Sequence, residues 1–87
     1  MLRIQKSIEG NDVRLKLSGR IEPEHLTELE HIIEDEARNR SVAIDLKDVT
    51  LVDRHGVEFL ARCEARSAKL ENCPAYVREW IVRERAR

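Results

Sequence analysis

A polar tetrapeptide between two apolar segments carries the side chains with the most chemical potential in this sequence. It runs from Asp53 through Arg54 and His55 to Gly56. A carboxylate in this position can accept hydrogen bonds from the first N–H groups of a following helix. A guanidinium can bind a phosphate or a carboxylate, and an imidazole titrates near neutral pH. Because α/β proteins commonly bind their ligands where a strand gives way to a helix, this segment is the candidate site.

Each residue of the tetrapeptide also has a purely structural interpretation. Asp53 can act only as a helix cap. Gly56 can permit a tight backbone turn or close packing of a helix. Arg54 and His55 can be ordinary exposed side chains of a loop. The sequence by itself leaves the structural and the functional interpretations open.

No other group of residues has the spacing of a catalytic centre or a metal site. His25, His31, Cys63 and Cys73 are not joined by CxxC or HxxxH spacing. Ser18 has no histidine or acid at the spacing of a nucleophile and its base. The three glycines lie far apart and form no phosphate-binding loop. We therefore expect no enzyme activity, no metal and no cofactor, with Cys63 as a small core residue.

The elements around the candidate site follow from the pattern of apolar residues. Residues 2–8 and 13–17 alternate apolar and polar side chains around the turn at Gly10-Asn11-Asp12, which predicts an antiparallel hairpin that ends at Ser18-Gly19. Residues 42–46 form a β-branched apolar run, typical of a strand buried on both faces. A second apolar group follows, made of Val49, Leu51 and Val52.

Three helices are predicted. The first begins at Pro23 and runs for about four turns, with apolar residues at spacings of three and four. The second begins at Val57 and ends near Arg66. The third begins at Pro74 and should bury Tyr76, Val77, Trp80 and Ile81. Residues 67–73 fit either an extension of the second helix or a short strand. This order predicts a single α/β domain of residues 1–87, ordered over about 2–82.

Composition excludes several classes of protein. The chain has 87 residues, with 16 Lys and Arg against 17 Asp and Glu, so it lacks the basic excess of a nucleic-acid-binding protein. It has no apolar run near the roughly 20 residues that span a bilayer. The first ten residues lack the features of a signal peptide. These observations predict a cytoplasmic protein with two reduced cysteines and no membrane insertion.

The first predicted helix is strongly acidic. Seven acidic residues lie from Glu22 to Glu36, and only Arg38 offsets them within the helix. Such a face is either simply solvated or a docking surface that steers a partner by charge. The last helix offers contrasting basic residues, which are Arg78, Arg83, Arg85 and Arg87.

Two segments resemble the STAS domain, the fold of bacterial anti-sigma factor antagonists: VRLKLSGRIEPEHLTEL and IDLKDVTLVDRHGVEFL. Leu17-Ser18-Gly19 matches the family's strand before the first helix, and Ile44-Asp45-Leu46 matches its central strand. Asp53 and Gly56 match the ends of the family's Asp-Ser-Ser/Thr-Gly turn. The resemblance extends from about residue 4 to residue 81. It implies a mixed sheet of about four strands, an antiparallel hairpin followed by parallel strands, with about three helices, and it favours a strand near residues 69–73.

The chain departs from the family pattern inside the turn. In the family, a partner kinase that is also the anti-sigma factor phosphorylates the first serine of the turn, and the phosphate breaks the complex. Arg54 occupies that position here and His55 the next. The resemblance therefore implies a protein-interaction module without the usual switch, whose partner is an anti-sigma factor or a kinase-like regulator. Asp53 to Gly56 and Glu58 would contact this partner.

Two alternatives remain open at this stage. The helix start and Arg54 can instead hold a nucleotide or another anion, because helix N-termini favour negative charge. The first strand can also pair with a second copy of the chain, since an exposed sheet edge offers unpaired backbone groups.

Overall fold

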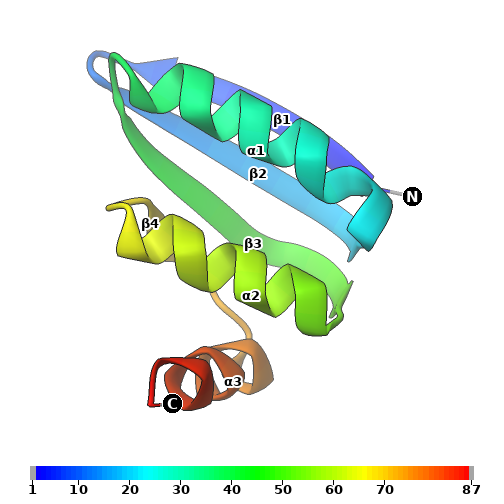
Figure 1. Ribbon diagram of the computed structural model, residues 1–87. Coiled ribbons are helices and arrows are strands. Elements are labelled where there is room, and N and C mark those ends of the chain that lie inside the picture. The colour runs from blue at the N-terminus through cyan, green and yellow to red at the C-terminus, as the bar shows by residue number, and fades with distance from the viewer. Residues whose placement is uncertain (1, 87) are drawn as a thin grey trace.

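The alternating segments of the first half of the chain form the larger part of a mixed four-stranded sheet (Figure 1). The computed structural model describes residues 2–86. Its elements are β1 (Leu2–Glu9), β2 (Asp12–Ile21), α1 (Pro23–Ala37), β3 (Ser41–Val52), α2 (Arg54–Ala65), β4 (Lys69–Glu71) and α3 (Ala75–Arg85). The strand order is β1-β2-β3-β4, with β1 antiparallel to β2 and the other neighbours parallel. The predicted fold class is thus confirmed, and residues 69–71 form the expected strand.

The two central strands are longer than the sequence predicts. β2 continues through Ser18 and Gly19 to Ile21, and β3 runs without a break from Ser41 to Val52. Gly19 has a positive φ of 98° and lies between two register shifts in the β2–β3 ladder. The polar pair therefore lies inside a strand, opposite an irregular part of β3, and does not end it, because hydrogen bonds to β3 outweigh the local preference for a turn.

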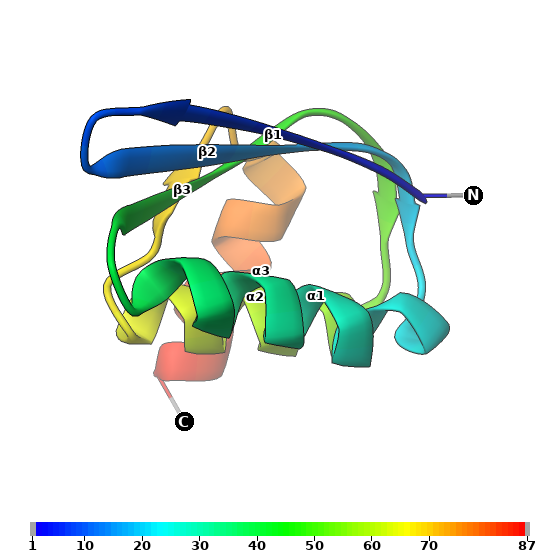
Figure 2. The same cartoon turned by 90° about the horizontal axis from the view of Figure 1, so that it is seen from above.

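The helices lie on one face of the sheet, as the view from above shows (Figure 2). The first halves of β2 and β3 bury every second residue toward them, and beyond the register shifts the spacing of the buried residues changes. The core residues of these strands are Val13, Leu15, Leu17, Ile21, Val42, Ile44, Leu46, Val49 and Val52. α1 contributes Leu29 and Ile33, and α2 contributes five buried residues that include Phe59. Burying one such side chain contributes roughly 1.5–3 kcal/mol, so this layer supplies most of the driving force for folding.

The last helix buries less than its sequence predicts. Val77 and Ile81 are buried and Trp80 is partly buried, but Tyr76 is exposed. α3 packs mainly against α2 and not against the sheet, so only a narrow stripe of it is covered. α3 also extends to Arg85, past residue 82, where the sequence pattern places the end of the ordered core.

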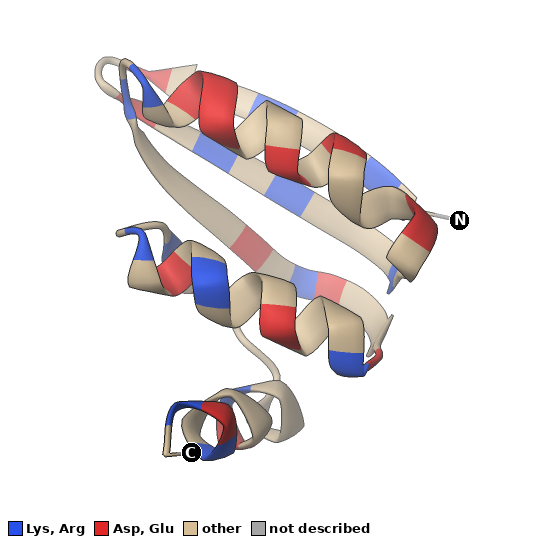
Figure 3. Cartoon of the chain, viewed as in Figure 1, with Lys and Arg blue, Asp and Glu red and all other residues tan. Residues whose placement is uncertain are grey.

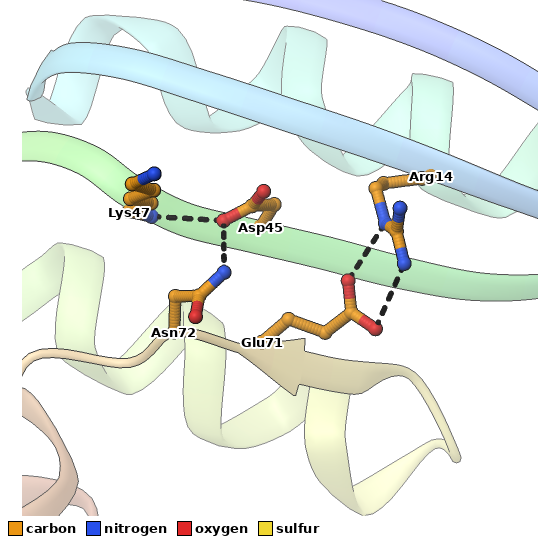
Figure 4. Close-up of polar contacts among 5 residues, drawn as sticks. All are labelled: Arg14, Asp45, Lys47, Glu71 and Asn72. Atoms are coloured by element: carbon orange, nitrogen blue, oxygen red, sulfur yellow. Dashed lines mark hydrogen bonds and ion pairs between the residues drawn. The ribbon is translucent and has the colours of Figure 1, made fainter.

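Side chains fasten the three-residue strand β4 to its neighbours (Figure 4). Arg14 reaches over β3 and donates from Nε to Oε1 of Glu71 at 2.8 Å and from Nη2 to Oε2 at 3.3 Å. Asp45 Oδ1 accepts hydrogen bonds from Asn72 Nδ2 and from the Lys47 N–H, both at 3.0 Å. The hydrogen bond from Asn72 is the main cause that lowers the pKa of Asp45. Polar groups on the solvated face of the sheet thus hold a strand too short to pair strongly by itself.

One carboxylate joins α3 to α2. Glu64 accepts from Arg78 Nη1 and Nη2 at 2.8 and 2.9 Å, and from Arg85 Nη2 at 2.7 Å. The hydrogen bonds from Arg78 are the main cause that lowers the pKa of Glu64. Arg83 pairs with Glu79 at 3.3 Å. The predicted basic surface of α3 is therefore largely engaged within the domain, while Arg87 lies outside the described residues.

We predict that Glu64→Gln lowers the free energy of unfolding by about 1 kcal/mol near neutral pH, after allowance for the half-exposed arginines. It should also weaken the acid sensitivity of the domain. The folded-state pKa of Glu64 is lowered, so its contribution is present above the unfolded pKa of about 4.3 and is lost as the pH falls through the folded pKa. Urea unfolding at neutral and acidic pH measures both effects.

The control is Glu79→Gln, which removes only an exposed pair within α3. It should change stability by less than about 0.5 kcal/mol. Equal stabilities of the Glu64 and Glu79 variants would contradict a special role of Glu64 in docking α3.

Candidate functional site

The candidate tetrapeptide is not a loop. β3 ends at Val52 and α2 begins at Arg54, so Asp53 alone separates them. The sequence predicts a helix start at Val57, and this is wrong by three residues because Asp53 caps the helix. Its Oδ1 accepts a hydrogen bond from the Gly56 N–H at 2.9 Å, and its carbonyl accepts from the Val57 N–H at 2.9 Å. The structural interpretation of Asp53 as a cap is thus confirmed.

Gly56 lets the first turn of α2 lie directly against the strands. A Cβ at this position would lie 2.6 Å from Val52 Cγ1 and 3.3 Å from Ile21 Cγ2. Val52 is a buried β-branched residue, whose side chain has little freedom to rotate away. The glycine is therefore required for close packing, one of the two structural interpretations that the sequence leaves open. It fixes the start of α2 on the carboxyl ends of β2 and β3.

The polar side chains of this first turn are exposed and only loosely paired. The Arg54 side chain is 60% exposed and lies 3.9 Å from Glu58, measured from Nε to Oε2. The His55 side chain is 68% exposed, with 3.8 Å between its Nδ1 and Glu58 Oε1. Both separations are too long for hydrogen bonds, and exposed ion pairs of this kind contribute little. The structure thus brings Arg54, His55 and Glu58 close together, but none of the three forms a short hydrogen bond with another.

Leu51 is a surface residue that the sequence pattern misplaces. It was grouped with Val49 and Val52 as part of an apolar run, and those two valines are indeed buried. Leu51 is 52% exposed. The β2–β3 register shifts between Gly19 and Arg20, so that Thr50 is the extra residue of a bulge and Leu51 leaves the buried face. A large, exposed apolar side chain therefore lies two residues before Asp53 in the chain.

Acidic residues lie along the length of α1 (Figure 3). Those near its C-terminal end face cations from other elements. Glu36 accepts from Lys6 at 2.8 Å and from Arg40 at 3.3 Å, and the hydrogen bond from Lys6 is the main cause that lowers its pKa. Glu34 lies 3.7 Å from Arg66. The acidic surface that the sequence indicates is thus partly neutralised by the fold.

The histidine and cysteine side chains with potential for metal binding or nucleophilic chemistry lie apart from one another in residues 2–86. These residues contain no group of three or more His, Cys, Asp or Glu that could hold a metal ion. His25 instead serves a helix start, because its Nδ1 accepts a hydrogen bond from the Glu22 N–H at 3.3 Å. Burial raises the pKa of Cys63 to about 11, which disfavours the reactive thiolate. Within the same residues, no helix is long and apolar enough to cross a membrane.

The fold and the site together define a small α/β domain whose candidate site is the exposed start of a capped helix, directly after a central strand. A family model described as "Mlab, STAS domain" matches residues 4–79. The chain belongs to the STAS domain family. A search of curated protein sequences finds no significant match.

Solved structures show the same fold. The unphosphorylated anti-sigma factor antagonist SpoIIAA is 17% identical, with a TM-score of 0.69 over 88% of this chain and 79% of SpoIIAA. An anti-sigma factor antagonist from Mycobacterium paratuberculosis is 18% identical, with a TM-score of 0.73 over 97% of this chain and 79% of that one. The structure of Mglu is 25% identical with a TM-score of 0.64 over 82% of this chain, which spans only 19% of Mglu. The predicted resemblance to anti-sigma factor antagonists is confirmed for the fold.

We predict that Asp53→Ala lowers the free energy of unfolding by about 1 kcal/mol, because the Gly56 N–H loses its acceptor. Asp53→Asn should retain most of the stability, since asparagine caps a helix about as well as aspartate. Urea denaturation of the three proteins measures the difference. Equal destabilisation by both substitutions would show that the charge of Asp53, and not its hydrogen bond, supports the helix.

Proposed function

We propose that this domain is a non-enzymatic protein-interaction module of bacterial signalling. In this proposal a protein partner contacts the exposed side chains of Arg54 and His55 together with Asp53 and Glu58. Gly56 is buried, so it supports the turn from below and does not itself face the partner. The observation that carries the proposal is a closely packed first helical turn whose exposed polar side chains make no short hydrogen bond within the domain. Asp53 and Gly56 fix the first turn of α2, and the polar groups on that turn have no short internal partner.

The chemistry of the surface favours a protein partner with acidic groups. Arg54 offers a planar guanidinium that can pair with a carboxylate through two hydrogen bonds. Leu51 adds an exposed apolar contact next to this polar turn, and interaction surfaces commonly combine an apolar centre with a polar rim. By resemblance to the family, an anti-sigma factor or a kinase-like regulator is the kind of partner we expect, in the cytoplasm.

The position of Arg54 also supports binding without a phosphorylation switch. Its side chain cannot accept a phosphate as the family's serine does, and a cation in the first turn opposes the helix dipole. An acidic group of a partner placed against Arg54 would relieve this unfavourable charge. We infer that the module binds constitutively or responds to another signal.

The nucleotide alternative has less support. A bound anion would have to compete with the Asp53 carboxylate, which already accepts from the helix N-terminus. Two surface cavities of about 240 and 280 Å³ among the described residues are both lined by other parts of the chain. Pairing of a second copy on the outer edge of β1 stays a prediction.

We predict that tagged wild-type protein retains a partner from the cytoplasm of its source organism and that Arg54→Glu with His55→Ala does not. Charge reversal at the centre of the proposed surface should reduce recovery at least about tenfold, since buried charged contacts contribute 1.5–3 kcal/mol. Quantitative mass spectrometry of the retained proteins measures the ratio.

The matched control is Arg3→Glu with Gln5→Ala, which makes the same change in charge on β1. This control should retain the partner like the wild type. Equal recovery by the site variant would contradict the proposed surface, provided that its thermal unfolding shows a folded protein.

We further predict that a STAS-partner kinase with ATP leaves the wild-type chain unmodified and that Arg54→Ser acquires one phosphate. The reason is that Arg54 fills the position of the family's phosphorylated serine and lies exposed at the helix start. Intact-mass spectrometry with fragmentation locates any phosphate. Phosphate on the wild type at Ser41, Thr50 or Ser67 would contradict the loss of the switch.

A further inference from the structure

A groove lies between the C-terminal halves of α1 and α2, in the half of α2 remote from Asp53. It has a volume of about 240 Å³, somewhat below the range of about 300–1,000 Å³ for drug-sized ligands, which restricts it to a small occupant. Figures 1 and 2 show the two helices running side by side on the same face of the sheet. The apolar residues that line the groove are Ile33, Ala37, Val42, Phe59, Cys63 and Ala68.

The floor of the groove is a part of the core that the helices cover incompletely. Ile33 is 9% exposed and Cys63 is 7% exposed, whereas Leu29 and Leu60, one turn earlier on the same helices, are 0% exposed. Val42 and Ala68 on the floor are likewise more exposed, at 6% and 8%, than most of the core. The apolar floor is thus buried but slightly less covered than the rest of the core, and an apolar occupant would complete its cover.

The two walls of the groove carry opposite charges. Glu30 and Glu34 come from α1, whereas Arg62 and Arg66 come from α2 or directly follow it. The contact between Glu34 Oε1 and Arg66 Nη1 is 3.7 Å, too long for a hydrogen bond. Glu30 and Arg62 have no ion pair within residues 2–86. A third rim arginine, Arg40, is already paired with Glu36 at 3.3 Å.

We propose that this groove binds a free α-amino acid with an apolar side chain. Its carboxylate would pair with Arg62 and Arg66, and its ammonium group with Glu30 and Glu34. Its side chain would cover the apolar floor. An α-amino acid carries its two charges on groups attached to one carbon, so its ammonium and carboxylate can lie over a glutamate and an arginine that are themselves neighbours, as Glu34 and Arg66 are at 3.7 Å.

A ligand with one charge fits these walls less well. A simple carboxylate would leave both glutamates unpaired and would be repelled by them, and a simple amine would meet the same difficulty at the arginines. A ligand without an apolar side chain would leave the floor exposed. The site is independent of the proposed partner surface, so either proposal can fail without the other.

The test is a titration of isotope-labelled protein followed by amide chemical shifts. L-leucine should give saturable shifts centred on Val42, Cys63 and Ala68, with a dissociation constant below about 1 mM, which corresponds to roughly 4 kcal/mol. Three probes each lack one feature: 4-methylpentanoate has no ammonium group, 3-methylbutylamine has no carboxylate, and glycine has no apolar side chain. Each should bind at least about tenfold more weakly, because charged hydrogen bonds or apolar burial are lost.

Two variants test the walls. Arg66→Gln and Glu34→Gln should each weaken leucine binding by about tenfold, while Arg20→Gln, the same exchange at an exposed residue of β2, should leave binding unchanged. Equal affinity for 4-methylpentanoate would overturn the amino-acid assignment, and absence of saturable shifts with leucine would overturn the site. Thermal unfolding checks that every variant is folded.

Discussion

The close contact between the first turn of α2 and the ends of β2 and β3 is the constraint on which the rest of this domain depends. Gly56 makes the contact sterically feasible, and Asp53 satisfies the backbone of the turn that results. With the helix fixed at this point, Val57, Phe59 and Leu60 are directed into the core. The same contact holds Arg54 and His55 at the surface as parts of a rigid helix.

Charge within this domain is used largely for internal contacts. Glu64 holds α3, Arg14 holds Glu71 of β4, and Glu36 joins α1 to Lys6 of β1. These partly exposed links are individually weak. The candidate surfaces consist of the charges that remain: Arg54 with His55 at one end of α2, and the groove walls at the other. The formal net charge of −1 does not show which charged residues are paired within the domain and which remain exposed.

Much of the fold could be predicted from the sequence because its signals are local. Alternation in residues 2–8 and 13–17 indicated the hairpin, and Pro23 with the apolar stripe of α1 indicated the first helix. The same kind of pattern places Leu51 in an apolar group with two valines that are buried, and predicts that Tyr76 is buried, yet both side chains are exposed. Their exposure depends on a bulge between two strands and on which neighbour α3 packs against. Neither is a property of the residues beside them in the chain.

The sequence by itself determined the α/β class, the hairpin, the family resemblance and the absence of serine at position 54, since each rests on residue types and their spacing. It also drew attention to residues 53–56. Only the tertiary structure decided that these residues form a cap and a first helical turn, because the distance from Gly56 to Val52 depends on how α2 packs against the sheet. The groove was likewise invisible in the sequence. Its walls come from α1 and α2, which are brought together by the intervening strand β3 and by burial of the core they share.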